Sequence, residues 1–137
     1  MWRALLAFSG DPEVASDAVA EAFAQALRRG EALRSPAGWV WRAAFRIARG
    51  ELKASRARPV RIRLAHADLP EPAVELIRAL GLLPMAQRAA VVMHHAADLS
   101  VREVAAALGT TAAAVRMNLT RGRRRLRELL EDDDEGG

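Results

Sequence analysis

The sequence predicts an all-α protein made of two small helical domains joined by a short linker. Its composition favours helix, because Ala, Leu and Arg dominate its 137 residues and Tyr is absent. Along most of the chain, apolar residues recur at steps of three and four. Residues 58–70 break that pattern and contain Pro59 and Pro70. We therefore expect one domain over 1–57, a linker over 58–70 and a second domain over 71–130.

In the first domain, proline marks the starts of two helices. Asp11-Pro12 combines a capping carboxylate with proline at the first helical position, which predicts a helix to about Arg29. Ser35-Pro36 repeats this signal, and the helix that it opens is expected to run to about Ala57. On the first of these helices, the residues expected to face the core are Val19, Phe23, Ala26 and Leu27.

The second domain is expected to end in a helix-turn-helix. Helical patterns cover about 71–81 and 85–97, and Ser100 with Glu103 then forms a capping box. A short helix over 101–108, a turn with Gly109 and a long basic helix follow, the last running from Ala112 to about Leu130. Residues 131–137 are acidic and end in two glycines, so we expect a disordered tail that competes with DNA for nearby arginines.

The last helix has an apolar face and a basic face. A buried stripe is expected from Val115, Leu119, Gly122, Leu126 and Leu129. A helix held by such a stripe can enter a major groove and present donors to base edges and phosphates. The alternative is an amphipathic surface helix whose arginines are only solvated. The residues predicted to bind DNA are Thr111, Arg116, Met117, Thr120, Arg121 and Arg124.

A second basic face runs along the helix that starts at Pro36. Its cations follow one another at steps of four and three, so they share one side of the helix. Trp39 lies one turn before them, and a basic groove with aromatic rings is how single-stranded DNA is held. In the alternative, the tryptophans are part of the core and the cations are only solvated. We favour a core role for Trp41 and leave both roles open for Trp39. The stripe consists of Arg42, Arg46, Arg49, Lys53 and Arg56.

An acidic row, Glu13, Asp17 and Glu21, is spaced four residues apart on the first proline-started helix. It is either a solvated face or a docking surface for a basic partner helix. No His or further acid is placed to complete a catalytic or metal site, and His94 and His95 are adjacent, so they point to different sides of a helix. We predict no metal and no cofactor.

Other classes of protein are disfavoured by composition. The chain has no Cys, which excludes disulfides and thiolate metal sites, and no apolar run approaches the ~20 residues that span a bilayer. Its formal net charge is +4, carried almost entirely by arginine. A soluble cytoplasmic protein without membrane contact is expected, and an enzyme is the weakest option because no catalytic motif is present.

Two blocks of the sequence resemble a known family, the extracytoplasmic-function sigma factors of bacterial RNA polymerase. Residues 17–23 and 35–42 resemble region 2 of that family, with Ser35-Pro-Ala-Gly-Trp39 as the core of the match. Residues 80–88, with Leu83-Pro84 and Gln87-Arg88, and the helix-turn-helix over 99–123 resemble region 4.

The resemblance implies a partner and a role for each surface. It implies that the chain binds core RNA polymerase and promoter DNA, with an anti-sigma factor as a further partner, and that it is not an enzyme. Asp17 and Glu21 match the segment that docks on polymerase. The helix with Trp39 matches the one that captures the melted −10 element, and Arg116 to Arg121 match the reader of the −35 element.

This chain departs from the family pattern at Ala20, Phe45-Arg46 and Gly50, and most of the family's first helix would precede Met1. Since Phe45-Arg46 stand where an Arg-Asn pair is common, −10 recognition is expected to be weak or altered. Two further hypotheses stay open: a degenerate sigma-like protein without initiation activity, and a stand-alone helix-turn-helix regulator that binds as a dimer.

Overall fold

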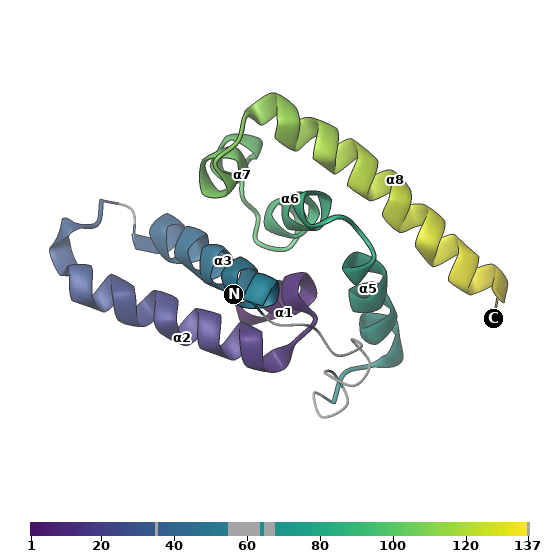
Figure 1. Ribbon diagram of the computed structural model, residues 1–137, viewed down its shortest axis with the longest axis horizontal. Coiled ribbons are helices and arrows are strands. Elements are labelled where there is room, and N and C mark those ends of the chain that lie inside the picture. Colours follow the sequence, from purple (N-terminus) through teal and green to yellow (C-terminus); the bar gives the residue numbers. More distant parts are fainter. Residues whose placement is uncertain (35, 55–63, 65–67, 137) are drawn as a thin grey trace.

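The computed structural model describes residues 1–34, 36–54, 64 and 68–136. Within these ranges all regular structure is helical and no strand occurs, so the predicted all-α class is confirmed (Figure 1). Each helix in this part of the chain is too short or too polar to cross a membrane. The helices, in order, are α1 (Trp2–Ser9), α2 (Pro12–Arg29), the 3-10 turn η1 (Gly30–Ala32), α3 (Pro36–Ala54), α5 (Glu71–Gly81), α6 (Met85–His95), α7 (Val101–Leu108) and α8 (Ala112–Gly136).

Helix α1 was not predicted from the sequence, although it forms part of the core. Leu5 and Phe8 are fully buried there, and the Phe8 ring meets the ring of Phe45 edge-on with centroids 5.5 Å apart. Gly10 ends the helix in the left-handed conformation, at φ 66°. An eight-residue helix is only marginally stable alone, so its packing on α2, α3, α5 and α6 is what stabilises it.

Helix α2 starts as predicted but turns a different face to the core. The Asp11 carboxylate accepts a hydrogen bond from the backbone N–H of Glu13 at 3.0 Å, with Pro12 at the first helical position. The expectation that Phe23 and Leu27 face the core is wrong, because their exposed fractions are 49% and 82%. Small residues let α2 lie close against α3, and these are the ones buried: Val14, Ala15, Ala18 and Ala22.

Helix α3 is described to Ala54, so the predicted end near Ala57 lies outside the described residues. Most of the predicted linker over 58–70 also lies outside them. Helix α5 begins at Glu71, where the sequence predicts the second domain to start.

The helix-turn-helix is formed by α7 and α8, as predicted. Ser100 Oγ accepts from the backbone N–H of Glu103 at 3.1 Å, and the Glu103 carboxylate accepts from the backbone N–H of Ser100 at 3.0 Å. Gly109 ends α7 with φ 66°. Thr111 Oγ1 then accepts from the backbone N–H of Ala114 at 3.1 Å and caps α8.

The apolar stripe of α8 packs on α6. Val115 and Leu119 are buried, and Leu126 and Leu129 pack against the same core, which confirms the predicted stripe. Gly122 lies at the point of closest approach, where a Cβ atom would stand 2.9 Å from Cγ2 of Val91. Glycine therefore sets the distance between the two helices.

The expected disordered tail is wrong for residues 131–136, because α8 continues to Gly136. Glu, Leu and Arg favour helix, and no proline or earlier glycine after Gly122 ends the hydrogen-bond ladder. Arg125 and Glu128 form an ion pair of 3.6 Å along this part of the helix.

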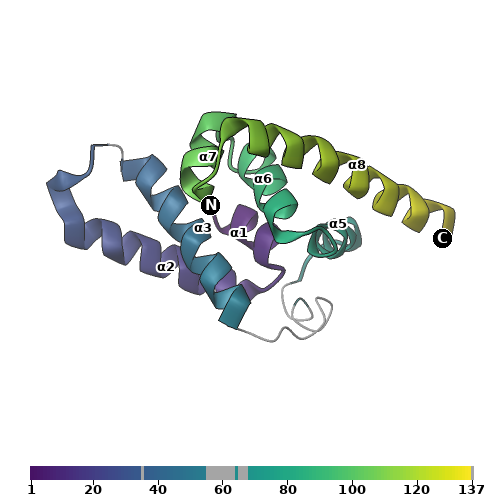
Figure 2. The ribbon, with the colours of Figure 1, turned by 45° about the horizontal axis from the view of Figure 1, so that its top comes forward.

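The two halves of the molecule share one continuous core. Helix α6 lies between α1 and α8, and α3 contacts α7 (Figure 2). Across this contact, Arg88 of α6 donates a hydrogen bond from Nη1 to the carbonyl oxygen of Phe8 at 3.1 Å, with its guanidinium 5.8 Å from the Phe8 ring centroid. The halves are thus packed on one another as well as connected along the chain.

Candidate nucleic-acid interface

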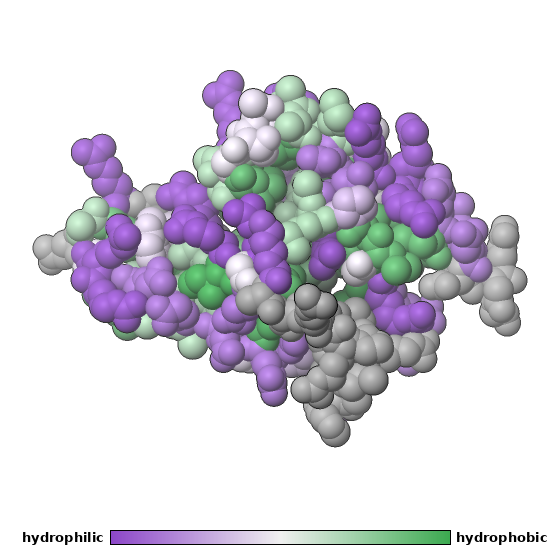
Figure 3. All heavy atoms as spheres, in the orientation of Figure 1, coloured by the Kyte–Doolittle hydropathy of each residue, from purple (hydrophilic) through white to green (hydrophobic). Residues whose placement is uncertain are grey.

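The predicted DNA-reading residues, Thr111 at the cap of α8 and five residues within the helix, are exposed together. Hydrophilic side chains project along the outer side of α8 in Figure 3. Opposite them, the apolar stripe holds the helix on α6. No acidic side chain forms an ion pair with this basic face in the described part of the chain. The exposed residues are Thr111, Arg116, Met117, Thr120, Arg121 and Arg124.

Two threonines of this surface already make hydrogen bonds within the protein. Thr111 Oγ1 accepts the capping bond, so its hydroxyl proton remains to be donated. Thr120 Oγ1 donates to the carbonyl oxygen of Arg116 at 3.0 Å, so only its lone pairs remain. At a base edge or phosphate, Thr111 would act as a donor and Thr120 as an acceptor.

The basic stripe of α3 lies partly against the C-terminal half. Arg46 and Lys53 are exposed, Arg42 and Arg49 are half-buried, and Arg56 lies outside the described residues. Arg46 and Arg49 line a narrow crevice whose opposite wall comes from α6 and α7, with Ala89, Met93, Ala107 and Leu108.

Oppositely charged side chains also lie near one another across the boundary between α3 and α7. Hydrogen bonds with Ser100 lower the pKa of Glu103, and the positive charge of Arg42 lowers it further. Arg42 of α3 and the capping box of α7 are therefore electrostatic neighbours, and the stripe does not face open solvent along its whole length.

The two tryptophans of α3 have different surroundings. The ring of Trp41 stacks on that of Phe45, with centroids 6.0 Å apart and planes at 21°, which agrees with a core role. Trp39 is half-buried, and the guanidinium of Arg29 lies 5.0 Å from its ring centroid. A base that stacks on this face of Trp39 would have to displace Arg29.

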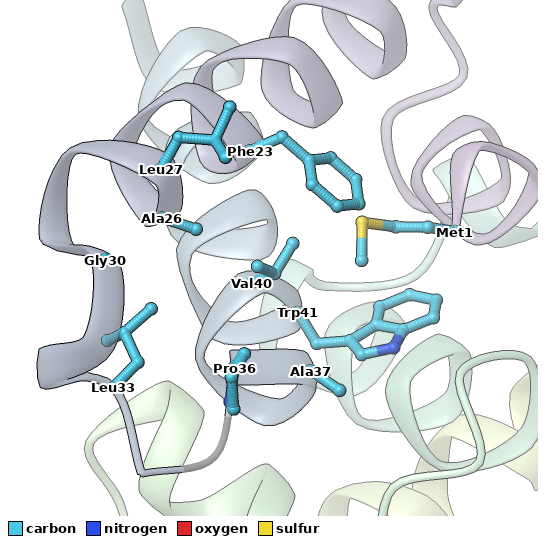
Figure 4. A pocket seen from close by; sticks show the side chains of 10 residues that line it. All are labelled: Met1, Phe23, Ala26, Leu27, Gly30, Leu33, Pro36, Ala37, Val40 and Trp41. Carbon is cyan, nitrogen blue, oxygen red and sulfur yellow. The ribbon is translucent and has the colours of Figure 1, made fainter.

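An apolar hollow of about 420 Å³ opens beside the tryptophans, between the end of α2 and the start of α3. Figure 4 shows Met1, Phe23 and Trp41 around its opening. The exposed Phe23 and Leu27, which the sequence predicts to be core, are part of its wall. Its other lining residues are Ala26, Gly30, Leu33, Pro36, Ala37 and Val40.

The acidic row lies on the exposed side of α2. Glu21 accepts hydrogen bonds from Nε2 of Gln25 at 3.0 Å and Nη2 of Arg28 at 3.1 Å. These two bonds lower the pKa of the Glu21 carboxyl. Glu13 and Asp17 are exposed as well, so the row is accessible to a partner.

Sequence reasoning missed one hydrogen bond beside the DNA-reading residues, between α8 and α6. His95 of α6 accepts a hydrogen bond from Nε of Arg123 at 2.9 Å. Arg123 follows Arg116 by seven residues, a spacing that could have placed it on the DNA-reading ridge. The position of His95 beside α8 depends on how α6 and α8 pack, which no local pattern indicates.

The comparisons agree with this geometry. Residues 73–126, which include the helix-turn-helix, match the family model for Sigma-70, region 4. The sigma factor RpoE from Bartonella quintana, solved in complex with the anti-sigma factor NepR, has a TM-score of 0.74 at 19% identity, over 95% of this chain and 89% of that one. CnrH in complex with the cytosolic domain of CnrY has a TM-score of 0.73 at 24% identity, over 96% and 80%. No curated protein matches the chain.

Proposed function

We propose that the chain is a sigma factor that directs core RNA polymerase to promoters. Residues 73–126 match Sigma-70, region 4, and the chain has the fold of the sigma factor RpoE. The resemblance seen in the sequence is thereby confirmed. The observation that carries the proposal is the exposed basic face of α8, with Arg116, Arg121 and Arg124, within that matched region. We propose a DNA-binding regulator of the extracytoplasmic-function kind, not an enzyme.

In this proposal the domain over 71–130 binds the −35 duplex. The helix-turn-helix enters the major groove with the slim start of α8, where Ala112, Ala113 and Ala114 allow close approach. Arg116 and Arg121 reach base edges or phosphates beyond this point. The tight cap at Thr111 and the packing of Val115 against the core support it, because they fix the helix before DNA arrives.

The domain over 1–57 binds the −10 element after it melts. Arg42, Arg46, Arg49 and Lys53 track the phosphates of the single strand, and Trp39 stacks on a base once Arg29 moves aside. Because Arg46 and Arg49 share a crevice with α6 and α7, full access to this stripe requires the C-terminal half to move away from α3. In this proposal, binding to core polymerase supplies the free energy for that separation.

Polymerase docks on α2 in this proposal. Asp17 and Glu21 present negative charge to a basic helix of the partner, and the apolar hollow at the C-terminal end of the same helix takes apolar side chains of the partner. Exposed Phe23 supports this, since a large apolar side chain left half-exposed in the wall of that hollow suits an apolar face of a partner.

We also propose an anti-sigma factor as a partner. The support is the likeness to RpoE, which was solved with the anti-sigma factor NepR. Such a partner would act by holding the two halves together or by covering α2.

Run-off transcription with core polymerase and a promoter library tests the proposal. The expected result is initiation at defined sites, reduced by Arg116→Ala and unchanged by Arg125→Ala, which removes a charge that is already paired with Glu128. A pull-down in which the chain does not associate with core polymerase would overturn it.

One observation favours a second candidate, a degenerate sigma factor that binds polymerase without melting DNA. Phe45-Arg46 stand where the family commonly has an Arg-Asn pair, and Phe45 is 2% exposed, packed between Phe8 and Trp41. It cannot contact DNA from there. Polymerase association without run-off product on any promoter would favour this candidate.

A further inference from the structure

His95 of α6 and Arg123 of α8 form a hydrogen bond at the side of the helix-turn-helix. Nε of Arg123 is a donor and cannot accept, so Nε2 of His95 at 2.9 Å must be the acceptor. The His95 ring is therefore neutral and carries its proton on Nδ1. Partial desolvation of the exposed His95 ring lowers its pKa, and the positive charge of Arg123 lowers it further, which favours this neutral form.

The bond leaves most of the Arg123 guanidinium able to bind another group. In the part of the chain that the structure describes, this is the only hydrogen bond of Arg123, and Arg123 forms no ion pair there. With Nε engaged, the two Nη groups keep four N–H donors at an exposed end of the side chain. That end has the planar fork that matches two oxygens of a phosphate.

The position of Arg123 on α8 suits a contact with the DNA backbone. It follows Arg116 by seven residues and Thr120 by three, so the three side chains share one ridge. This ridge borders the buried stripe of Val115 and Leu119, next to α6. The N-terminal residues of a recognition helix contact base edges, so Arg116 near the start of α8 can reach a base, whereas Arg123, two turns further along and beside α6, is placed for a phosphate.

We propose that Arg123 binds a phosphate of the −35 duplex at the edge of the interface, and that His95 is its positioning residue. His95 accepts the hydrogen bond from Nε of Arg123 and fixes the plane of the guanidinium, so that the Nη groups point to the phosphate. The entropy lost on ordering a long side chain is then lost before DNA binds. This inference rests on the proposed function, because it assumes that α8 enters the groove.

Binding of the full chain to a mixed-sequence DNA duplex of about 20 base pairs tests it, by fluorescence anisotropy from about 50 to about 200 mM NaCl. Arg123→Ala is expected to weaken binding several-fold and to lower the slope of log affinity against log salt by about 0.9, the value for one phosphate. Arg125→Ala is the matched control, since Arg125 pairs with Glu128 on another side of α8, and its slope should stay at the wild-type value.

The variants of His95 separate positioning from charge. His95→Ala is expected to weaken binding less than Arg123→Ala and to keep the wild-type salt slope, because the positive charge remains. His95→Gln is expected to restore most of the affinity, because its amide oxygen can accept the same bond. In the Arg123→Ala background, His95→Ala should have no further effect. Thermal unfolding followed by circular dichroism checks that each variant is folded.

An unchanged salt slope in folded Arg123→Ala would overturn the phosphate contact. An equal loss from His95→Ala with and without Arg123 would overturn the positioning role. Wild-type protein whose affinity does not depend on salt would instead contradict duplex binding by α8 altogether, so failure of the proposed function gives a different result.

Discussion

Arg88 of α6 donates a hydrogen bond from Nη1 to the carbonyl oxygen of Phe8, and the two residues stand 80 positions apart in the chain. The same guanidinium reaches the carbonyl oxygen of Leu83 from Nη2 at 3.4 Å. A cation between two carbonyl groups, over the ring of Phe8, joins α1 to the approach to the helix-turn-helix. The loss of stability when Arg88 is replaced therefore measures how much this contact between the two halves contributes to folding.

Replacing Arg88 by Ala is expected to lower the free energy of unfolding by about 2 kcal/mol, since partly buried hydrogen bonds to a charged group are lost and two carbonyls stay unpaired. Urea denaturation measures this. Arg102→Ala on the exposed side of α7 is the control and should change stability by less than about 0.5 kcal/mol. Equal losses in the two variants would show that the contact to Phe8 contributes nothing.

Gly122→Ala is expected to destabilise the protein by about 1 to 3 kcal/mol, because the new Cβ would meet Val91 of α6 at 2.9 Å in a packed core. The matched control is Gly50→Ala on α3, where a Cβ meets nothing within 4 Å. There the gain in helix propensity should raise stability by about 0.5 to 1 kcal/mol. Thermal melts of both variants give the comparison, and effects of the same sign would contradict the close approach at Gly122.

The stability of the protein should fall with acidity through His95. Its pKa in the folded state lies below the ordinary value of 6.5, first because the ring is partly desolvated and then because of the positive charges of Arg123 and His94. The unfolded chain therefore takes up a proton before the folded chain does. The contribution of neutral His95 is complete above pH 6.5 and is lost as the pH falls below it.

Unfolding of wild type and of His95→Gln, measured at about pH 7.5 and about pH 5.5, isolates this effect, since most carboxylates stay charged in that window. The variant should be less sensitive to pH than the wild type. Identical sensitivity would mean that His95 does not titrate differently in the two states.

Arg116 and Arg124 should differ in what their loss does to DNA binding. If Arg116 reads a guanine, Arg116→Ala loses roughly 1 to 3 kcal/mol of discrimination at one base pair. Arg124→Ala should weaken binding evenly across sequences and flatten the salt slope. Selection of bound sequences from a random duplex library distinguishes the two, and an even loss for Arg116→Ala would make it a phosphate contact.

Features that depend on a few neighbouring residues could be predicted from the sequence. Asp11-Pro12, the Ser100 and Glu103 capping box and Gly109 act through backbone groups within one turn, and each begins or ends a helix where the sequence predicts. The helix-turn-helix followed from these local signals and from the stripe of Val115 and Leu119.

What could not be predicted depends on which surfaces meet. Phe23 and Leu27 fit the helical spacing of a core face, but alanines one step away allowed a closer approach to α3 and were buried instead. The crevice at Arg46 and the bond from Arg123 to His95 join segments distant in sequence, so periodicity along a single helix could not reveal them.

The continuation of α8 to Gly136 changes what its acidic end can do. A disordered tail could fold back and neutralise the arginines, but a helix extends by about 1.5 Å per residue, which puts Asp132 roughly 24 Å along the axis from Arg116. Charges on the surface are screened beyond about 8 to 10 Å at physiological ionic strength. While α8 stays helical, Glu131 and Asp132 therefore cannot compete with DNA for Arg116 within the same molecule. Their negative charge instead lies toward the C-terminal end of α8, where it can act only on groups near that end.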